Sequence, residues 1–140
     1  MLLKAILLTL IPVIVAVDHP VTVGLNGGLT FTPDAVLADI GDTLTFAFVS
    51  KNHSVTTTNF SGAVCPPPAG GIGVNGWDSG FLSALGTVMP QFVYTVVDTE
   101  PHFASCMQAA GAHCRAGMNF ALNPTAAMTF AQFNANAMAS

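Results

Sequence analysis

The chain has 140 residues, of which 51% are hydrophobic and only 7% are charged, and its formal net charge is −4. A chain of this length can bury one hydrophobic core, so we expect a single domain. Lys and Arg together number three. That scarcity excludes the basic surface with which proteins bind nucleic acids and anionic lipid headgroups.

The most apolar stretch of the chain lies at its N-terminus. Lys4 is followed by a mostly apolar run over residues 5–17, with the small residue Ala16 near its end. This pattern is typical of a secretory signal peptide over residues 1–17, cleaved near Ala16 or Val17. The run is shorter than the ~20 apolar residues of a membrane span. We therefore predict a secreted protein with no membrane attachment after cleavage, and a net charge of −5 once Lys4 is lost.

The segments after the signal have the patterns of β-strands. Residues 21–24 and 29–33 flank Asn26-Gly27-Gly28, which predicts a hairpin. Residues 35–50 predict two more strands around Gly41. In the second of these, one face carries hydrophobic side chains and the other smaller ones, which is strand periodicity: Leu44, Phe46 and Phe48 alternate with Thr43, Thr45 and Ala47.

The second half of the chain continues the strand pattern. Residues 91–98 alternate in the same way, and 102–106 and 118–123 are predicted to be the closing pair of strands. Frequent glycine and the enrichment in β-branched and aromatic residues favour an all-β sandwich or small barrel over residues 18–124. Residues 61–80, rich in Pro and Gly, are predicted to be an irregular loop. We expect residues 125–140 to be a marginal helix or disordered.

The chain has three cysteines, Cys65, Cys106 and Cys114. In an oxidising compartment cysteines pair, and three cannot all pair within one chain. A spare thiol is reactive unless it pairs with another chain or binds a metal as thiolate. Two pairings are open at this point: Cys65 with Cys114, which leaves Cys106 at the end of a strand, or Cys65 with Cys106, which leaves Cys114.

Residues 105–118 combine cysteines, a histidine and methionines in a way that suggests a metal site. Cys106 ends one predicted strand, His113 lies in the following loop, and Met118 begins the next strand. His53, after a turn elsewhere in the chain, could complete the set. Two imidazoles and a thiolate with a weak, distant thioether are the ligands of a blue copper electron-transfer site. This set predicts one type 1 copper ion.

The order of motifs resembles a known family. "GDTLTFAF", "NHSVT", a Cys in a Pro-rich loop, "SGF", "PQFVYTVVDTEPHFASC", "HCRAGM" and "NFALNP" follow one another over about residues 21–124. This is similar to the cupredoxin domain of fungal extracellular serine-rich proteins, relatives of the plant phytocyanins.

The resemblance implies a Greek-key β-sandwich with copper ligands His53, Cys106, His113 and Met118 and a disulfide between Cys65 and Cys114. The chain departs from the phytocyanin pattern at Ser54, where phytocyanins have Asn. We expect the backbone N–H of Ser54 to donate to the Cys106 sulfur.

The function that we predict is one-electron transfer to a transient redox partner by a secreted monomer that is not an enzyme. An uncharged patch around His113 could dock the partner: Met107, Ala109, Ala110, Gly111 and Ala112. The alternative is a non-redox module that sequesters copper or interacts with the cell wall. The chain has four histidines, too few for the cluster of a multicopper oxidase. Zinc on His53, Cys106, His113 and Cys114 is also possible by ligand count, with Cys65 as the spare thiol.

The remaining notable residues have structural interpretations. We expect His19 to be a terminal residue, His102 to lie on a strand surface, and Trp77 and Tyr94 to pack in the core. Two glycosylation sequons begin at Asn52 and Asn59. A glycan at Asn52 would crowd the adjacent ligand, so we predict that only Asn59 is modified.

Overall fold

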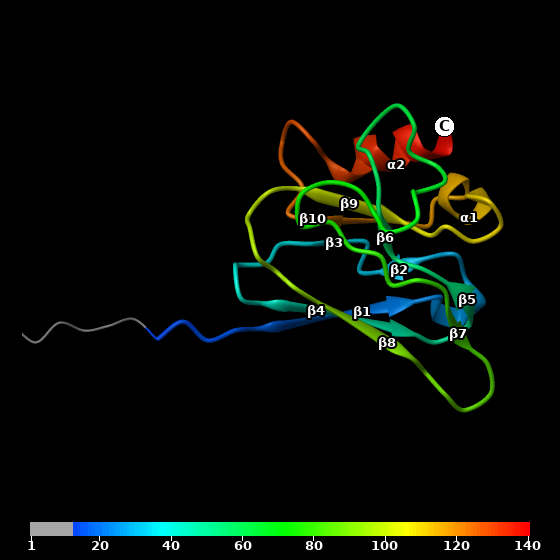
Figure 1. Ribbon diagram of the computed structural model, residues 1–140, viewed down its shortest axis with the longest axis horizontal. Helices are drawn as coiled ribbons and strands as arrows, with labels where there is room; N and C mark the ends of the chain where they lie inside the picture. Colours follow the sequence, from blue (N-terminus) through cyan, green and yellow to red (C-terminus); the bar gives the residue numbers. More distant parts are fainter. Residues whose placement is uncertain (1–12) are drawn as a thin grey trace, which may run out of the picture.

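The computed structural model describes residues 13–140. The predicted signal segment up to residue 12 lies outside the described residues. Two four-stranded sheets face one another (Figure 1), with strand orders β2-β1-β4-β8 and β3-β10-β9-β6. The first sheet contains β1 (Asp18–Val23), β2 (Phe31–Thr32), β4 (Thr43–Phe48) and β8 (Gln91–Thr95). The second contains β3 (Ala35–Val36), β10 (Asn119–Leu122), β9 (His102–Ser105) and β6 (Thr56–Thr57). The predicted all-β sandwich is therefore confirmed.

The strand pairing follows the predicted pattern in most places. β1 and β2 form the predicted antiparallel hairpin, with Thr22 opposite Thr32, and its connection contains the short 3-10 helix η1 (Leu25–Gly27). β9 and β10 are the antiparallel closing pair. The two strands around Gly41 belong to opposite sheets, because β3 pairs with β10 whereas β4 pairs with β1 and β8. The chain therefore crosses between the layers at this turn.

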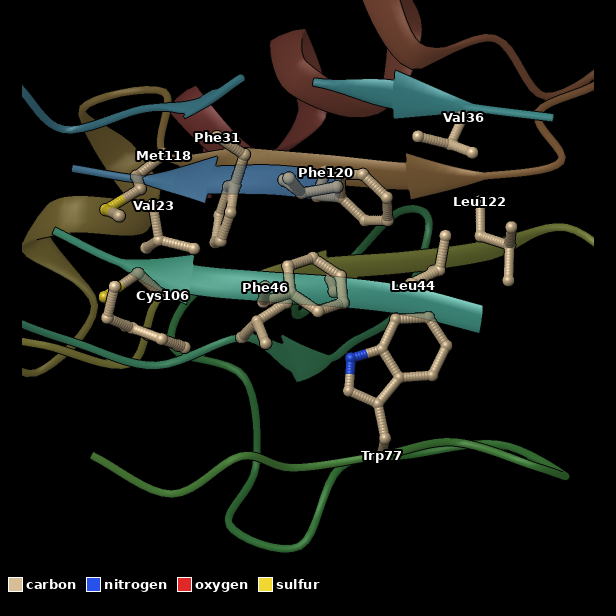
Figure 2. Close-up of a cluster of buried hydrophobic side chains, with 14 of the residues drawn as sticks. Val23, Phe31, Val36, Leu44, Phe46, Trp77, Cys106, Met118, Phe120 and Leu122 are labelled. Carbon is tan, nitrogen blue, oxygen red and sulfur yellow. The ribbon is translucent and has the colours of Figure 1, made fainter. Parts of the chain in front are cut away.

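The core between the sheets consists of the side chains that the alternating sequence pattern predicts to be buried. Leu44, Phe46 and Phe48 of β4 are completely buried, whereas the side chains between them are only partly buried. The Phe46 ring packs edge-on against that of Phe120 at 5.1 Å between centroids, and both lie between the sheets in Figure 2. Trp77 is also buried, and its ring packs against that of the partly buried Tyr94 with 4.3 Å between centroids and a tilt of 37°. The predicted packing role of these aromatic side chains is confirmed.

Short elements close the ends of the sandwich. β5 (Lys51–His53) pairs with β7 (Leu82–Ala84) in a separate sheet, and the helix α1 (Ala112–Arg115) lies at the same end of the molecule (Figure 1). The sequence pattern does not predict α1, because four residues are too few to show helical periodicity. Residues 61–80 form the predicted irregular loop.

The last segment forms a helix that packs on the outer face of the second sheet. α2 (Phe130–Met138) begins at Thr129, whose side chain caps it by accepting from the Gln132 N–H. Phe133 is completely buried, and its ring lies 4.8 Å from that of Phe103 in β9. Because this contact joins the helix to the sheet, residues 130–138 belong to the same folded unit as the sandwich.

Candidate metal centre

Three side chains from separate parts of the chain meet at one end of the sandwich. His53 ends β5, Cys106 directly follows β9, and His113 lies in α1, all at the end of the molecule where β5, β7 and α1 gather (Figure 1). His53 and Cys106 are completely buried, and His113 is partly exposed. These are three of the residues that the sequence analysis selected.

The donor atoms of the three side chains converge. Nδ1 of His53 lies 3.2 Å from Nδ1 of His113, and the Cys106 sulfur lies 3.8 Å and 3.6 Å from these two nitrogens. First-row ions such as zinc bind nitrogen and sulfur at about 2.0–2.3 Å, so donors spread around one such ion lie roughly 3.2–4 Å from each other. The three donors therefore fit a single ion of this size.

Backbone conformation in the loop between Cys106 and α1 sets the position of His113. Ala109 and Ala110 both have left-handed φ values of 55° and 51°, and Gly111 follows at 84°. Left-handed alanine is unfavourable by roughly 1–2 kcal/mol per residue, so the surrounding contacts must hold the loop in place. Gly111 approaches the chain at Pro66 so closely that a Cβ on it would lie 2.9 Å from Pro66 backbone atoms.

The disulfide fastens this loop to the core. Cys65 and Cys114 are bonded, with their Cα atoms 5.8 Å apart, and Cys106 is the free cysteine. The pairing implied by the family resemblance is confirmed. The alternative with Cys114 as the free thiol is wrong, and so is the zinc site that includes Cys114, because its sulfur is in the disulfide.

The surroundings of the Cys106 sulfur act on its protonation in opposite directions. Burial raises the pKa of the thiol, whereas hydrogen bonds from the backbone N–H groups of Ser54 and Gln108 lower it. These donors lie 3.4 Å and 3.5 Å from the sulfur. The predicted Ser54 hydrogen bond is confirmed. Burial is the larger effect, so the pKa of the metal-free thiol is raised overall. The two N–H groups offset part of this effect and favour the thiolate, the form that binds metals.

The two imidazoles are held in the neutral form. Burial, and then the nearby His113 and Lys51, lower the pKa of His53 from 6.5 to about 4. Burial, and then Lys51, also lower the pKa of His113. A neutral imidazole has a free lone pair at one nitrogen, as metal binding requires. Nε2 of His53 is buried without a hydrogen-bond partner in the described part of the chain.

Met118 lies next to the three donors in the fold. Its backbone carbonyl accepts from the Cys106 N–H at 3.2 Å, and its N–H donates to the His113 carbonyl at 3.0 Å. The side chain is completely buried. Figure 2 shows its sulfur at the same end of the hydrophobic core as that of Cys106. The structure thus places all four predicted ligand residues at this end.

The sequence analysis missed Gly24, which contacts the site. Gly24 has a φ of 80°, and a Cβ on it would lie 3.1 Å from Nε2 of His53 and 2.5 Å from Oγ of Ser50. The residue therefore gives the His53 ring its space. The sequence offered one signal for this role, a glycine at the end of a predicted strand. That feature is common to many turns and does not by itself indicate a contact with the site.

The two other histidines lie away from the site, each with a carboxylate partner. Nε2 of His19 is 2.9 Å from Asp42, and Nε2 of His102 is 2.8 Å from Asp98. The prediction that His102 lies on a strand surface is wrong, since only 9% of it is exposed. Its ring packs against Trp77 because both faces of β9 are covered, one by the opposite sheet and the other by loops and α2.

Sequence comparison with known proteins finds a curated relative of this chain. No protein-family model matches the chain. A curated relative, a "probable GPI-anchored cupredoxin-1" of Arthroderma benhamiae, is 29% identical over 104 residues, which are 74% of this chain and 50% of the relative. The chain thus spans about half the length of that protein.

Solved structures agree with this relative. A mutant plastocyanin of fern superposes with a TM-score of 0.51 at 22% identity, over 74% of this chain and 97% of the plastocyanin. The chain has the cupredoxin fold. Auracyanin B gives the same TM-score at 16% identity, over 82% of this chain and 93% of its own. The family resemblance drawn from the sequence is confirmed at the level of the cupredoxin domain, while its narrower fungal assignment stays a prediction.

In this cupredoxin domain the described residues contain one cluster of metal-ligating side chains, His53, Cys106 and His113. The same part of the chain, residues 13–140, has no helix with the length and apolar character to cross a bilayer.

Proposed function

We propose that the protein is a secreted cupredoxin that binds one copper ion and carries single electrons. The observation that carries this proposal is the convergence of two imidazole nitrogens and a thiol sulfur within 3.2–3.8 Å of each other. No carboxylate joins the cluster in the described residues. Met118 would be the weak fourth ligand. This set is characteristic of blue copper sites, whereas magnesium and calcium prefer oxygen ligands.

The residues of the site have separate tasks in this proposal. His53 and His113 offer neutral imidazoles, since burial lowers the pKa of both. Cys106 offers a thiolate that the N–H groups of Ser54 and Gln108 stabilise. The copper ion supplies a one-electron couple when it is bound. The disulfide and the closely packed Gly111 hold α1 in place, which would keep the ligand positions similar in the two oxidation states of the copper.

His113 is the route by which an electron would reach a partner, because it is the partly exposed member of the three-donor cluster. Ala109, Ala110 and Ala112 beside it are exposed, whereas Gly111 is buried against Pro66 and does not contribute to the surface. These three alanines and the partly exposed Met107 form the proposed docking patch for a transient redox partner. In Ala112→Glu we expect the electron exchange rate with that partner to fall. An unchanged rate would exclude the patch.

Secretion is part of the proposal and rests on the signal-like segment. The curated relative carries a GPI anchor in its name, which is consistent with export. The disulfide between Cys65 and Cys114 is also consistent with an oxidising compartment, where disulfides form and persist. The remaining thiol, Cys106, is buried and has no cysteine left to pair with in the chain.

The experiment that tests the metal assignment is titration of the metal-free protein with Cu(II), followed by visible and electron paramagnetic resonance spectroscopy. We expect an intense thiolate-to-copper band and a narrow hyperfine splitting at one equivalent. Cys106→Ser should abolish the band. His19→Gln is the matched control, because His19 pairs with Asp42 far from the site, and it should keep the band. A colourless complex, or zinc bound in preference to copper, would contradict the proposal.

A second measurement separates electron transfer from copper storage. If the protein carries electrons, the copper-loaded form should show a fast, reversible one-electron wave in voltammetry. Copper that is bound but does not exchange electrons would favour the sequestering module instead.

A further inference from the structure

The folded chain begins at Val17. The side chains of Val13 and Ile14 are 86% and 84% exposed, and no secondary structure includes residues 13–17. Val17 is the first described residue whose backbone is bonded on both sides. Its N–H donates to Oδ1 of Asp42 at 2.8 Å, and its carbonyl accepts from the N–H of Thr43 at 2.9 Å. The apolar residues before it thus remain in solvent.

The acceptor of the Val17 N–H is a buried carboxylate with few charged neighbours. Asp42 is 7% exposed. Its Oδ2 accepts from the Asp39 N–H at 3.1 Å and pairs with Nε2 of His19 at 2.9 Å.

The hollow around Asp42 is lined by residues from β1, the β3–β4 turn and the segments after β8 and β10. Its titratable members are His19, Asp39 and Asp42. Asp18 lies next in the chain and bonds Thr43 and Thr45 instead. Among residues 13–140, no lysine or arginine lines the hollow.

We propose that the mature protein begins at Val17 and that its new α-ammonium group binds the Asp42 carboxylate. A signal peptidase would hydrolyse the Ala16–Val17 peptide bond, consuming one water and leaving a carboxylate on Ala16 and an amine on Val17, which is protonated at neutral pH. Ala16 is the small residue that such enzymes require before the cut. This inference rests on the predicted signal peptide and is independent of the metal site.

The cut changes the chemistry at Asp42 without moving the nitrogen. In the precursor a neutral amide N–H faces the carboxylate, and after cleavage the same nitrogen carries a full positive charge. The bond in the precursor already has one charged partner, the carboxylate, and cleavage adds the attraction between two opposite charges. This attraction is screened less where a carboxylate is shielded from water, and Asp42 is 7% exposed. The same cut removes the exposed apolar residues. Export would therefore yield a more stable protein with a less apolar surface.

The first test is the N-terminus of the secreted protein. The full chain is expressed in a secreting host, and the product is examined by intact mass and N-terminal peptide mapping. We expect the mature chain to start at Val17. A start at Asp18 or His19, a start at or before Ala16, or a retained leader would overturn the proposal.

The second test probes the ammonium group directly. With Lys51→Arg, a chain that starts at Val17 has its α-amine as the only amine. If Asp42 holds the ammonium, the pKa of the amine rises above its usual 7.7–8.0, and acylation at neutral pH should be about tenfold slower per unit of rise. The control is the same chain extended by Ala16, whose amine lies one residue further from Asp42. Equal rates in the two chains would contradict the pairing.

A third readout assigns the effect to Asp42. Nα-acetylation removes the charge and should lower the Tm of the Val17 form by a few degrees. The same loss should occur in Asp39→Asn, an exposed acid of the same hollow, but not in Asp42→Asn. An equal loss in Asp42→Asn would refute the contact. If Asp42→Asn does not fold, the comparison of acylation rates between the chain that starts at Val17 and the chain that starts at Ala16, both with Asp42 intact, decides the question. Copper binding enters none of these measurements, so their failure would leave the proposed function intact.

Discussion

The two ends of the sandwich both contain histidines, and they hold them differently. At the end away from the metal centre, His19 and His102 each lie within 2.9 Å of a carboxylate, Asp42 and Asp98. At the other end, His53 and His113 face each other and a thiol, and no carboxylate of the described residues joins them. Nδ1 of His53 lies 3.2 Å from Nδ1 of His113 and 3.8 Å from the Cys106 sulfur.

This contrast separates structural from metal-binding histidines. Buried polar atoms usually face a hydrogen-bonding partner, whereas Nδ1 of His53 and Nδ1 of His113 face each other and the Cys106 sulfur. Nε2 of His19 and Nε2 of His102 each pair with a carboxylate, so these nitrogens are already occupied. His53, His113 and Cys106 direct their donor atoms at one another and gain most from an ion between them.

The largest expected effect at the metal end comes from removing its disulfide, for which the other end has no counterpart among the described residues. Cys65→Ala with Cys114→Ala opens a loop whose ends are 49 residues apart, and should lower the free energy of unfolding by roughly 4 kcal/mol in the chain-entropy account. Copper affinity should fall as well, since α1 is no longer fastened. Urea denaturation and Cu(II) titration measure the two quantities.

The control for the disulfide variant is Cys106→Ala, which keeps the bridge. It should lose the copper spectrum and retain most of its stability. A disulfide-free protein within about 1 kcal/mol of the wild type would show that the loop is held by packing alone.

The second effect is a pH dependence that distinguishes the two ends. In the metal-free protein the pKa of His53 is about 4, below its usual 6.5. As the pH falls, His53 is therefore protonated in the unfolded state before it is protonated in the folded state. Stability should therefore fall as the pH drops from about 6.5 to about 4, by an amount on the order of 2–3 kcal/mol. His53→Leu should remove most of this slope, and His113, whose pKa is also lowered from 6.5, accounts for the remainder. Denaturation at half-unit pH steps measures it.

The carboxylates at the other end respond in a lower pH window. Hydrogen bonds from His19, Val17 and Asp39 lower the pKa of Asp42, and those from Asn75 and His102 lower that of Asp98, both below 3.8. Their contribution is present above that value and is lost as the pH falls further. A slope between pH 6.5 and 4 that is undiminished in His53→Leu would contradict the proposed difference between the two ends.

The third effect tests how closely the chain packs around His53. Gly24 and Gly27 have similar left-handed φ values, 80° and 74°, but a Cβ on Gly24 would contact His53 and Ser50, whereas one on Gly27 would meet nothing within 4 Å. Gly27→Ala should cost about 1 kcal/mol from backbone strain alone. Gly24→Ala should cost about 2 kcal/mol and also weaken copper binding. Equal copper affinities in the two variants would exclude a role for Gly24 in placing the ring.

The smallest effect concerns the glycosylation sequons. Asn52 is partly buried in β5, and its side-chain amide donates to Gln108 at 3.3 Å, whereas Asn59 is exposed. In secreted protein we expect a glycan on Asn59 only, with little change in stability. Peptide mapping that finds a glycan on Asn52 would contradict this and would imply a more open metal end.

The sequence by itself determined the elements that depend on local periodicity. The alternation in 43–48 predicts the buried face of β4, and the closing pair β9 and β10 follows from the same rule, because side chains of a strand point to opposite faces with a period of two. The types and spacing of Cys106, His113 and Met118 were also sufficient to suggest a metal centre, since few other residues in the chain are reactive.

Only the tertiary structure decided which distant groups meet. It joined Cys65 to Cys114, brought His53 within 3.8 Å of Cys106, and placed Asp42 on the Val17 N–H. It also buried His102 and turned residues 130–138 into a docked helix. These contacts depend on how the sheets stack and where loops cross, and a local pattern carries no information about partners that lie dozens of residues away.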